Sequence, residues 1–113
     1  MNSVYHKKIA DLIARAYPNL ATTHQLEFKN VFGAIGGYVN GRIFGSWGKF
    51  GFALRLPPKT LLTLFLKKEA RHLKYFPNGH VKKEYAVLHK RVMEDKGRLR
   101  TLLKESIRYT LSA

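Results

Sequence analysis

Residues 26–56 decide the fold of this 113-residue chain, and they have the sequence LEFKNVFGAIGGYVNGRIFGSWGKFGFALRL. Most of the glycines fall in this stretch, which is also dense in Val, Ile, Phe, Tyr and Trp, a composition typical of β-strands. Asn40-Gly41 lies between the apolar pairs Tyr38-Val39 and Ile43-Phe44. It predicts a two-residue hairpin turn of type I′, because Asn and Gly tolerate the positive φ that both central residues of this turn adopt.

The predicted hairpin fixes which side chains face each other. In this register Tyr38 lies opposite Ile43, and Phe44 lies opposite Gly37, so that an aromatic ring covers a bare glycine. A second turn at Gly48-Lys49 leads into a strand that ends at Pro57, in which large apolar residues alternate with small or polar ones. That alternation predicts a strand with one face toward a core.

Helical periodicity flanks the glycine-rich stretch on both sides. Apolar residues recur at helical spacing in the predicted helices over residues 3–17, 59–71 and 96–110, the last with Asp95 as its N-cap. A loop is predicted over residues 22–25, and further strands over residues 73–76 and 82–88. The predicted order α-β-β-β-α-β-β-α, with adjacent hairpins, indicates an α+β domain in which helices pack on an antiparallel sheet.

Composition excludes several classes of protein. Lys and Arg number 21 against seven Asp and Glu, a net charge of +14, while 45% of the residues are hydrophobic, too many for a disordered chain. The absence of cysteine excludes disulfides and thiolate metal sites. No apolar run approaches the ~20 residues of a membrane span, and the N-terminus has no signal-peptide pattern. We therefore expect one folded domain over residues 1–113, in the cytoplasm and without membrane contact.

Two runs carry a family resemblance: FGAIGGYVNGRIF at residues 32–44 and YFPNGHVKKEYAVL at residues 75–88. Together, and with the spacing between them, they resemble the TfoX (Sxy) N-terminal domain family over almost the whole chain. The resemblance implies an α+β fold of the order α-β(3)-α-β(2)-α, in agreement with the order above. It also implies a link to natural competence, since full-length TfoX proteins promote expression of DNA-uptake genes together with the cyclic-AMP receptor protein. The family offers no catalytic residues to carry over.

Motifs of catalysis and cofactor binding are absent from the sequence. The glycine pattern around Gly48-Lys49 lacks both ends of a P-loop, and the glycines do not open a helix as in a dinucleotide fingerprint. The five histidines lie far apart without metal-ligand spacing, and the seven acids are scattered among basic neighbours. Glu84 is predicted to point outward from its strand and to pair with a lysine. We expect neither catalytic residues nor a metal or cofactor, and therefore no enzyme.

The basic residues concentrate in the second half of the chain. Residues 58–113 hold 14 basic and five acidic residues, against seven and two in residues 1–57. A net charge of +14 exceeds the ~2–8 that a small domain needs for solubility, which favours a polyanionic partner. Without a known base-reading motif, contacts to the nucleic-acid backbone are expected. The predicted contact residues are a stripe on the last helix, Lys96, Arg100, Lys104 and Arg108, a second group, Lys67, Lys68, Arg71 and Lys74, and the pair Lys82 and Lys83.

Other interpretations stay open at this stage. A charged helix face is commonly no more than a solvated surface. The charge could instead meet an acidic protein partner, with the sheet edge or an apolar helix face supporting a homodimer; an exposed apolar patch would favour this case. Tyr38, Trp47 and Phe50 could stack on unpaired bases, although aromatic residues at strand alternation more often cover a core or a hairpin. A deep pocket lined by Glu84 and a histidine would favour an enzyme.

Overall fold

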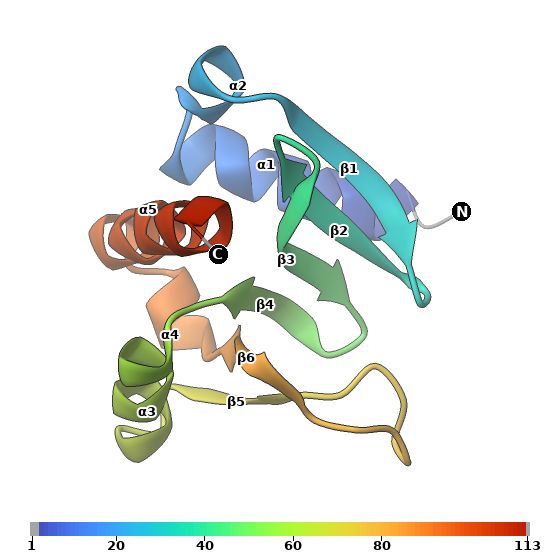
Figure 1. The fold of residues 1–113 in the computed structure, drawn as a ribbon, viewed down its shortest axis with the longest axis vertical. Coiled ribbons are helices and arrows are strands. Elements are labelled where there is room, and N and C mark those ends of the chain that lie inside the picture. Colours follow the sequence, from blue (N-terminus) through green and yellow to red (C-terminus); the bar gives the residue numbers. More distant parts are fainter. Residues whose placement is uncertain (1–2, 113) are drawn as a thin grey trace.

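The computed structural model describes residues 3–112, whose arrangement Figure 1 shows. Six antiparallel strands form one sheet of order β1-β2-β3-β4-β6-β5. The strands are β1 (Leu26–Val31), β2 (Ala34–Val39), β3 (Arg42–Gly48), β4 (Gly51–Arg55), β5 (Ala70–Leu73) and β6 (Lys82–Leu88). The helices are α1 (Ser3–Ala16), α2 (Leu20–Thr23), α3 (Pro58–Leu66), α4 (Lys90–Met93) and α5 (Lys96–Ser112). The fold class is α+β, as the sequence predicts.

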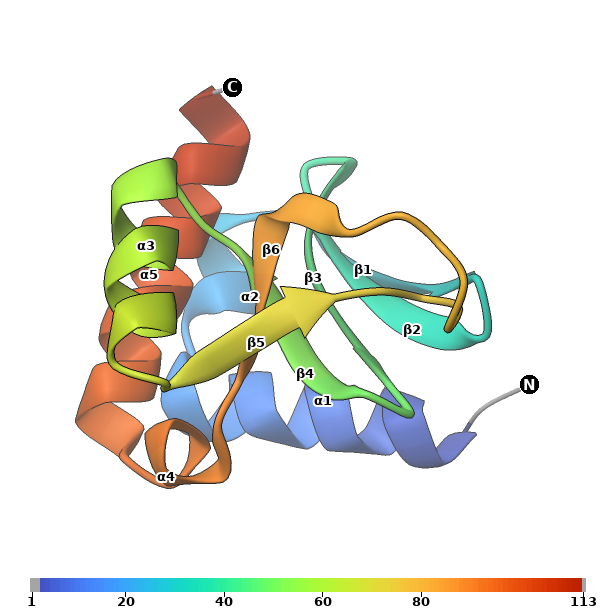
Figure 2. The ribbon, with the colours of Figure 1, turned by 90° about the horizontal axis from the view of Figure 1, so that it is seen from below.

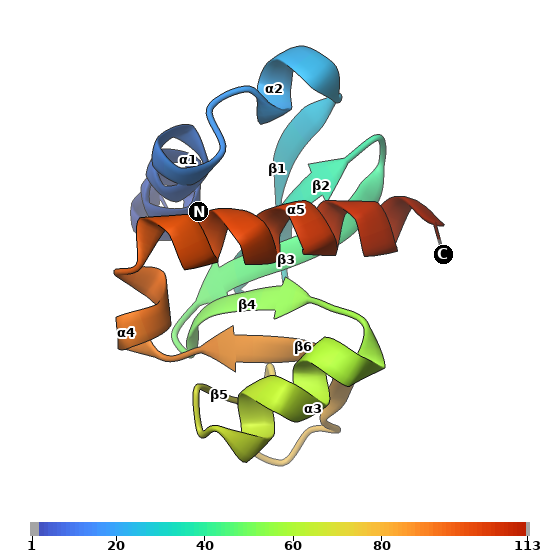
Figure 3. The same ribbon diagram turned by 90° about the vertical axis from the view of Figure 1, so that its left-hand side faces the viewer.

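Helices α3 and α5 and three of the strand connections lie on different sides of the molecule. Helix α1 contacts β2 and β3, α5 contacts β3 and β4, and α3 contacts β5 and β6. Seen from the helical side, α5 crosses in front of the strands with α3 beside it (Figure 3). Figure 2 shows α3 and α5 on one side, and the β1–β2, β3–β4 and β5–β6 connections on the other. The fold therefore offers two separate surfaces, one helical and one made of loops.

The core lies between the sheet and the two long helices. Apolar side chains of α1 and α5 pack there against alternate residues of the strands, namely Ile9, Leu12, Ile13, Phe44, Phe52, Leu54, Leu99, Leu103 and Ile107. A second, smaller cluster on the opposite face of the sheet contains Ala53, Leu73 and Val87. Tyr85 packs on this second cluster, and burial raises the pKa of its hydroxyl to about 12. Both faces of the sheet are thus at least partly covered.

Several elements follow the sequence closely. Strand β6 has the predicted bounds, and α1 and α5 differ from the predicted helices by no more than two residues. The Asp95 Oδ1 atom accepts a hydrogen bond from the Arg98 amide at 3.1 Å, which confirms the N-cap. The turn at Asn40-Gly41 has φ values of 50° and 83°, and Tyr38 pairs with Ile43 as predicted. Local turn and capping chemistry was therefore sufficient for these elements.

The predicted pairing of Phe44 with Gly37 is wrong. Gly37 pairs with Gly45 instead, and the register shifts between Gly37 and Tyr38 because Phe44 is an extra residue in β3, a β-bulge. The Phe44 ring nevertheless covers Gly37: a Cβ atom added to Gly37 would lie 2.8 Å from the ring atom Cζ. The expected cover of a glycine by this ring is therefore present, but it comes from the bulge.

The predicted helix over residues 59–71 ends earlier, at Leu66. Lys68 has a φ of 56°, its amide donates to the Phe65 carbonyl, and the Glu69 amide donates to the Leu64 carbonyl. These two bonds form a Schellman motif, which stops the helix without the glycine that commonly marks it. The strand predicted over residues 73–76 consequently begins and ends earlier, as β5.

Three further elements differ from the prediction. The stretch over residues 26–56 contains four strands and not three, because Phe32 and Gly33 form an additional turn with φ values of 47° and 81°. The loop predicted over residues 22–25 overlaps the short helix α2, and the short helix α4 was not predicted. Helices of a single turn carry too few residues to show a helical period in the sequence.

Two glycine substitutions test this packing. A Cβ atom at Gly45 would lie 2.7 Å from the Ala53 carbonyl oxygen of the neighbouring strand, so the backbones must move apart in G45A. We expect G45A to lower the free energy of unfolding by about 1–3 kcal/mol in urea denaturation. The control is G97A, in the first turn of α5 where the added methyl group has room, which should raise stability by at most about 1 kcal/mol. Equal stability of the two variants would contradict the close strand approach.

Candidate functional site

The predicted stripe of cations lies on the outer side of α5. Lys96, Arg100, Lys104 and Arg108 are all exposed, whereas Leu99, Leu103 and Ile107 of the same helix are buried. At a rise of 1.5 Å per residue, the four charges extend over about 18 Å of the helix. Figure 3 shows α5 at the front of the molecule along this length. The stripe is therefore a solvent-facing row of positive charge that winds gradually around α5, by about 40° for each step of four residues.

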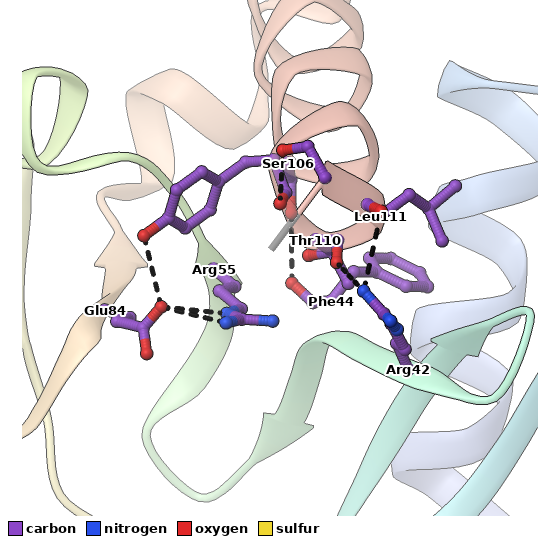
Figure 4. A network of polar contacts seen from close by, with 9 residues as sticks. Arg42, Phe44, Arg55, Glu84, Ser106, Thr110 and Leu111 are labelled. Atoms are coloured by element: carbon purple, nitrogen blue, oxygen red, sulfur yellow. Dashed lines mark hydrogen bonds and ion pairs between the residues drawn. The ribbon is translucent and has the colours of Figure 1, made fainter.

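Two polar contacts fix how α5 sits on the sheet (Figure 4). The buried Ser106 hydroxyl donates to the Phe44 carbonyl oxygen at 3.1 Å, at the β-bulge. Near the C-terminus of α5, Arg42 Nη1 donates to the carbonyl oxygens of Thr110 and Leu111 at 3.3 and 3.5 Å. A guanidinium at this end of a helix also interacts favourably with the helix dipole. Both contacts lie on the sheet side of α5, so they keep the charged stripe turned outward.

The prediction that Glu84 pairs with a lysine is wrong, because its partner is Arg55. Arg55 donates to its Oε1 atom from Nε at 3.1 Å and from Nη2 at 3.0 Å, and the Tyr109 hydroxyl donates to the same oxygen at 3.2 Å (Figure 4). The Arg55 guanidinium also lies 5.5 Å from the centre of the Tyr109 ring. Glu84 meets Arg55 because β4 and β6 are neighbours in the sheet, a proximity that the adjacent lysines in sequence do not reveal. The carboxylate therefore ties α5 to β4 and β6.

A second carboxylate ties α5 to the end of α3. Glu69 is 9% exposed, and its two carboxylate oxygens accept hydrogen bonds from Nη1 and Nη2 of Arg98, which makes the pair bidentate. The hydrogen bonds from Arg98 hold the pKa of Glu69 below its ordinary value of 4.5, against the opposing effect of burial. The same pairing raises the pKa of Arg98. This contact brings Lys67 and Lys68, which directly precede Glu69, to the same side of the molecule as α5.

Of the remaining predicted contact residues, Arg71 lines one hollow together with Lys68, whereas Lys74, Lys82 and Lys83 lie toward the loop end. Strand β5 separates Lys74 from Lys67 and Lys68 by about 13 Å of extended chain. Arg71, on β5, donates from Nη2 to the carbonyl oxygen of Phe50 at the β3–β4 turn. Lys74 and Lys82 line hollows at the loop end of the sheet, and Lys83 is exposed on β6. The predicted contact residues therefore divide into three groups: the α5 stripe, the cations Lys67, Lys68 and Arg71 around the α3–β5 corner, and the cations Lys74, Lys82 and Lys83 toward the loop end.

The ion pairs of the described residues lie away from the stripe. Ion pairs join Lys7 to Asp11, Arg55 to Glu84, Lys90 to Glu94 and Arg98 to Glu69. Within residues 3–112, none of the four stripe cations forms an ion pair with a carboxylate. Lys104 lies over the Tyr17 ring, with its Nζ atom 5.8 Å from the ring centre. Together with Arg108 and His24 it lines a shallow groove of about 540 Å³ between α5 and the α1–α2 connection. The positive charge of the stripe is thus available to a ligand.

Sequence reasoning missed part of the exposed surface. The aromatic residues that it considered, Tyr38, Trp47 and Phe50, are all half-buried, whereas Phe32 and Phe76 are 62% and 57% exposed. Both exposed rings sit in turns next to glycine, in Phe32-Gly33 and in the Phe76 to Gly79 loop. An aromatic residue inside a turn motif is the signal that could have identified them.

Other kinds of site find no support in the described chain. Among residues 3–112, no group of three or more His, Asp or Glu side chains could hold a metal ion. No helix in this range is both long and apolar enough to cross a membrane.

Comparison with known proteins gives one match. The family model described as the TfoX N-terminal domain matches residues 19–109, which is most of the chain. No curated protein and no solved structure shows significant similarity to it. The matched range begins just before α2 and ends within α5, so it includes the whole sheet and all four residues of the stripe.

The Glu69–Arg98 pair makes stability depend on acid pH. Because the pKa of folded Glu69 lies below 4.5, the pair stabilises the fold fully above pH 4.5, and this contribution is lost as the pH falls through the lower, folded pKa. We expect E69Q to melt several degrees below the parent at neutral pH, with the difference shrinking in acid. E94Q removes an exposed carboxylate, 3.9 Å from Lys90, and should change the melting temperature little. Thermal melts across pH measure this, and a difference independent of pH would contradict the assignment.

Proposed function

Because the chain belongs to the TfoX N-terminal domain family, we propose that it is a small regulatory or accessory protein, without catalysis of its own, that contacts nucleic acid through its basic residues. The family supplies the regulatory setting, that of competence-regulator-like proteins. The proposed ligand comes from the surface of this chain. Its contacts are to the phosphate backbone and do not depend on base sequence.

One observation carries the proposal: the unpaired cation stripe on α5. Charges four residues apart on a helix repel one another by a few tenths of a kcal/mol per pair. Only Glu105 lies near them in sequence, and among residues 3–112 no carboxylate forms an ion pair with them. A polyanion would convert this repulsion into attraction and release counterions as it binds. The spacing also suits a phosphate backbone, because four helical residues rise about 6 Å. Every second phosphate of one strand lies about 7 Å apart along the DNA axis.

The expected lack of sequence preference follows from what α5 exposes. Its N-terminal half is joined to the α3–β5 corner by the ion pair of Arg98 with Glu69, and its inner side is buried on β3 and β4. Its exposed side carries the row of long, flexible cations together with small residues such as Thr101. Lysines bind phosphates as point charges and arginines through their guanidinium hydrogen bonds, whereas base identity is distinguished only when such groups reach base edges in a groove. The surface therefore fits backbone contact.

A second candidate function is favoured by a separate observation on α3. Leu62 and Leu66 lie one turn apart on its outer side and are 59% and 74% exposed. Such a pair fits a protein partner or a second copy of the chain. Light scattering after size exclusion, with L62S/L66S beside the parent, measures whether this side forms a dimer. An acidic protein partner would also use the basic residues, and the salt titration below distinguishes the ligands by comparing DNA with an acidic protein.

Charge reversal on the stripe tests the proposed function. In R100E/K104E two exposed cations become carboxylates, so phosphate contacts become repulsive while the buried side of α5 is unchanged. We expect the affinity for a labelled 20-base-pair duplex to fall at least about tenfold, and the slope of log K against log salt to shrink by about 2. Fluorescence anisotropy at 50, 100 and 200 mM salt measures both quantities, with an acidic protein as competitor.

The matched control for this experiment is K8E/R15E. It makes the same change in net charge on exposed positions of α1. Its effect on duplex affinity should be small, because it leaves the stripe intact. Equal losses in the two variants would show that only total charge matters, and unchanged affinity in R100E/K104E would remove the stripe from the interface. Circular dichroism confirms that each variant is folded.

A further inference from the structure

At the loop end of the sheet, aromatic rings from three connections form one continuous row. Phe32 belongs to the β1–β2 turn, Phe50 to the β3–β4 turn, and Tyr75 and Phe76 to the β5–β6 loop. The ring centres of Phe32 and Tyr75 lie 5.3 Å apart, those of Phe50 and Tyr75 5.5 Å apart, and those of Phe32 and Phe76 6.0 Å apart. Figures 1 and 2 both show these three connections together, away from α5. We call these four residues the aromatic row.

Three adjoining hollows surround the aromatic row. Their volumes are about 280, 200 and 440 Å³, and Tyr75 lines all three of them. A hydrogen bond fixes the Tyr75 ring on the sheet, because its hydroxyl lies 3.0 Å from the hydroxyl of Ser46, which is fully buried in β3. The two exposed rings, Phe32 and Phe76, therefore stand beside a fixed ring, with open space on either side.

The charge around the aromatic row has one sign. Lys49, Lys74 and Lys82 line the three hollows, and no carboxylate does so. The Lys82 Nζ atom lies 6.0 Å from the centre of the Phe32 ring. Within residues 3–112, none of these lysines forms an ion pair. The aromatic row is thus a surface of exposed rings bordered by cations.

Folding alone does not account for Phe32. It has a φ of 47°, a conformation that disfavours bulky side chains, and its ring is 62% exposed. The same molecule has the equivalent turn at Asn40-Gly41, where asparagine takes this conformation with a φ of 50°. Asparagine would therefore serve the turn better than phenylalanine does. The ring at position 32 gains little burial in return, which indicates that its role lies at the surface.

We propose that the aromatic row binds single-stranded nucleic acid, with unpaired bases stacked on Phe32 and Phe76 and phosphates held by Lys49, Lys74 and Lys82. Exposed aromatic faces alternating with cations are the features by which proteins bind single strands without regard to sequence. A duplex keeps its bases stacked on one another and cannot offer them. This inference takes the class of ligand from the proposed function but places it on different residues, on the opposite side of the molecule from the α5 stripe.

The experiment compares two labelled ligands, a 20-nucleotide oligodeoxythymidylate and a 20-base-pair duplex, by fluorescence anisotropy at constant salt. The variant is F32N/F76A, in which asparagine suits the turn as it does at position 40. We expect its affinity for the single strand to fall at least about tenfold, since each base stacked on an aromatic ring contributes roughly 5- to 100-fold. Its affinity for the duplex should change less than about twofold. Because F32N relieves the turn, the melting temperature of that single variant should not fall.

The control L62S/L66S removes two equally exposed apolar side chains from α3 and should leave single-strand affinity unchanged. R100E/K104E should lose duplex affinity while F32N/F76A retains it, so failure of the stripe and failure of the aromatic row are distinguishable. The inference is overturned if the parent does not bind the single strand, or if F32N/F76A binds it as the parent does. It is equally overturned if polyglutamate competes as well as oligodeoxythymidylate, because the surface would then recognise charge alone, as in an acidic protein partner.

Discussion

The β-bulge at Phe44 is the constraint on which the rest of the structure depends. One extra residue in β3 turns the Phe44 ring over Gly37 and leaves the Phe44 carbonyl oxygen to the Ser106 hydroxyl of α5. A backbone carbonyl buried without a partner would be costly, so the bulge and the helix need each other. The Phe44 ring and the Ile9 side chain of α1 both lie over Gly37, where an added Cβ atom would contact the two side chains. A single residue thus sets the positions of both long helices on the sheet.

The acidic and the basic residues have different roles in this arrangement. Asp95 caps α5, Glu69 joins α5 to the end of α3, and Glu84 joins α5 to β4 and β6. Each of these carboxylates is used to position the same helix. Their cationic partners are Arg98 and Arg55, which are less exposed than the cations of the stripe. The few acids hold the scaffold together, and the excess positive charge is left on the outside.

Elements of the fold that depend on neighbouring residues can be predicted from the sequence, whereas elements that depend on contacts between distant residues cannot. Elements set by local signals were predicted well: the Asn40-Gly41 turn, the Asp95 cap and the apolar periods of α1 and α5. The end of α3 was not predicted, because Lys68 adopts the left-handed conformation that glycine usually adopts at the end of a helix. The bulge at Phe44 was not predicted either, because its partners, Ser106 of α5 and Ile9 of α1, lie far from it in the sequence. Neither the end of α3 nor the bulge is indicated by the residues next to it in the sequence.

The candidate site divides in the same way. The α5 stripe was predictable because four cations on one helix share a period with the apolar residues between them. The aromatic row was not, since it forms only when connections from residues 32, 50 and 75 meet. The sheet order places β1 and β5 at opposite edges, so the rings of Phe32 and Tyr75 meet only because the sheet curves and the β5–β6 loop reaches back across its end. A linear sequence shows charge on a helix directly, but it shows a surface made of loops only through the topology that assembles it.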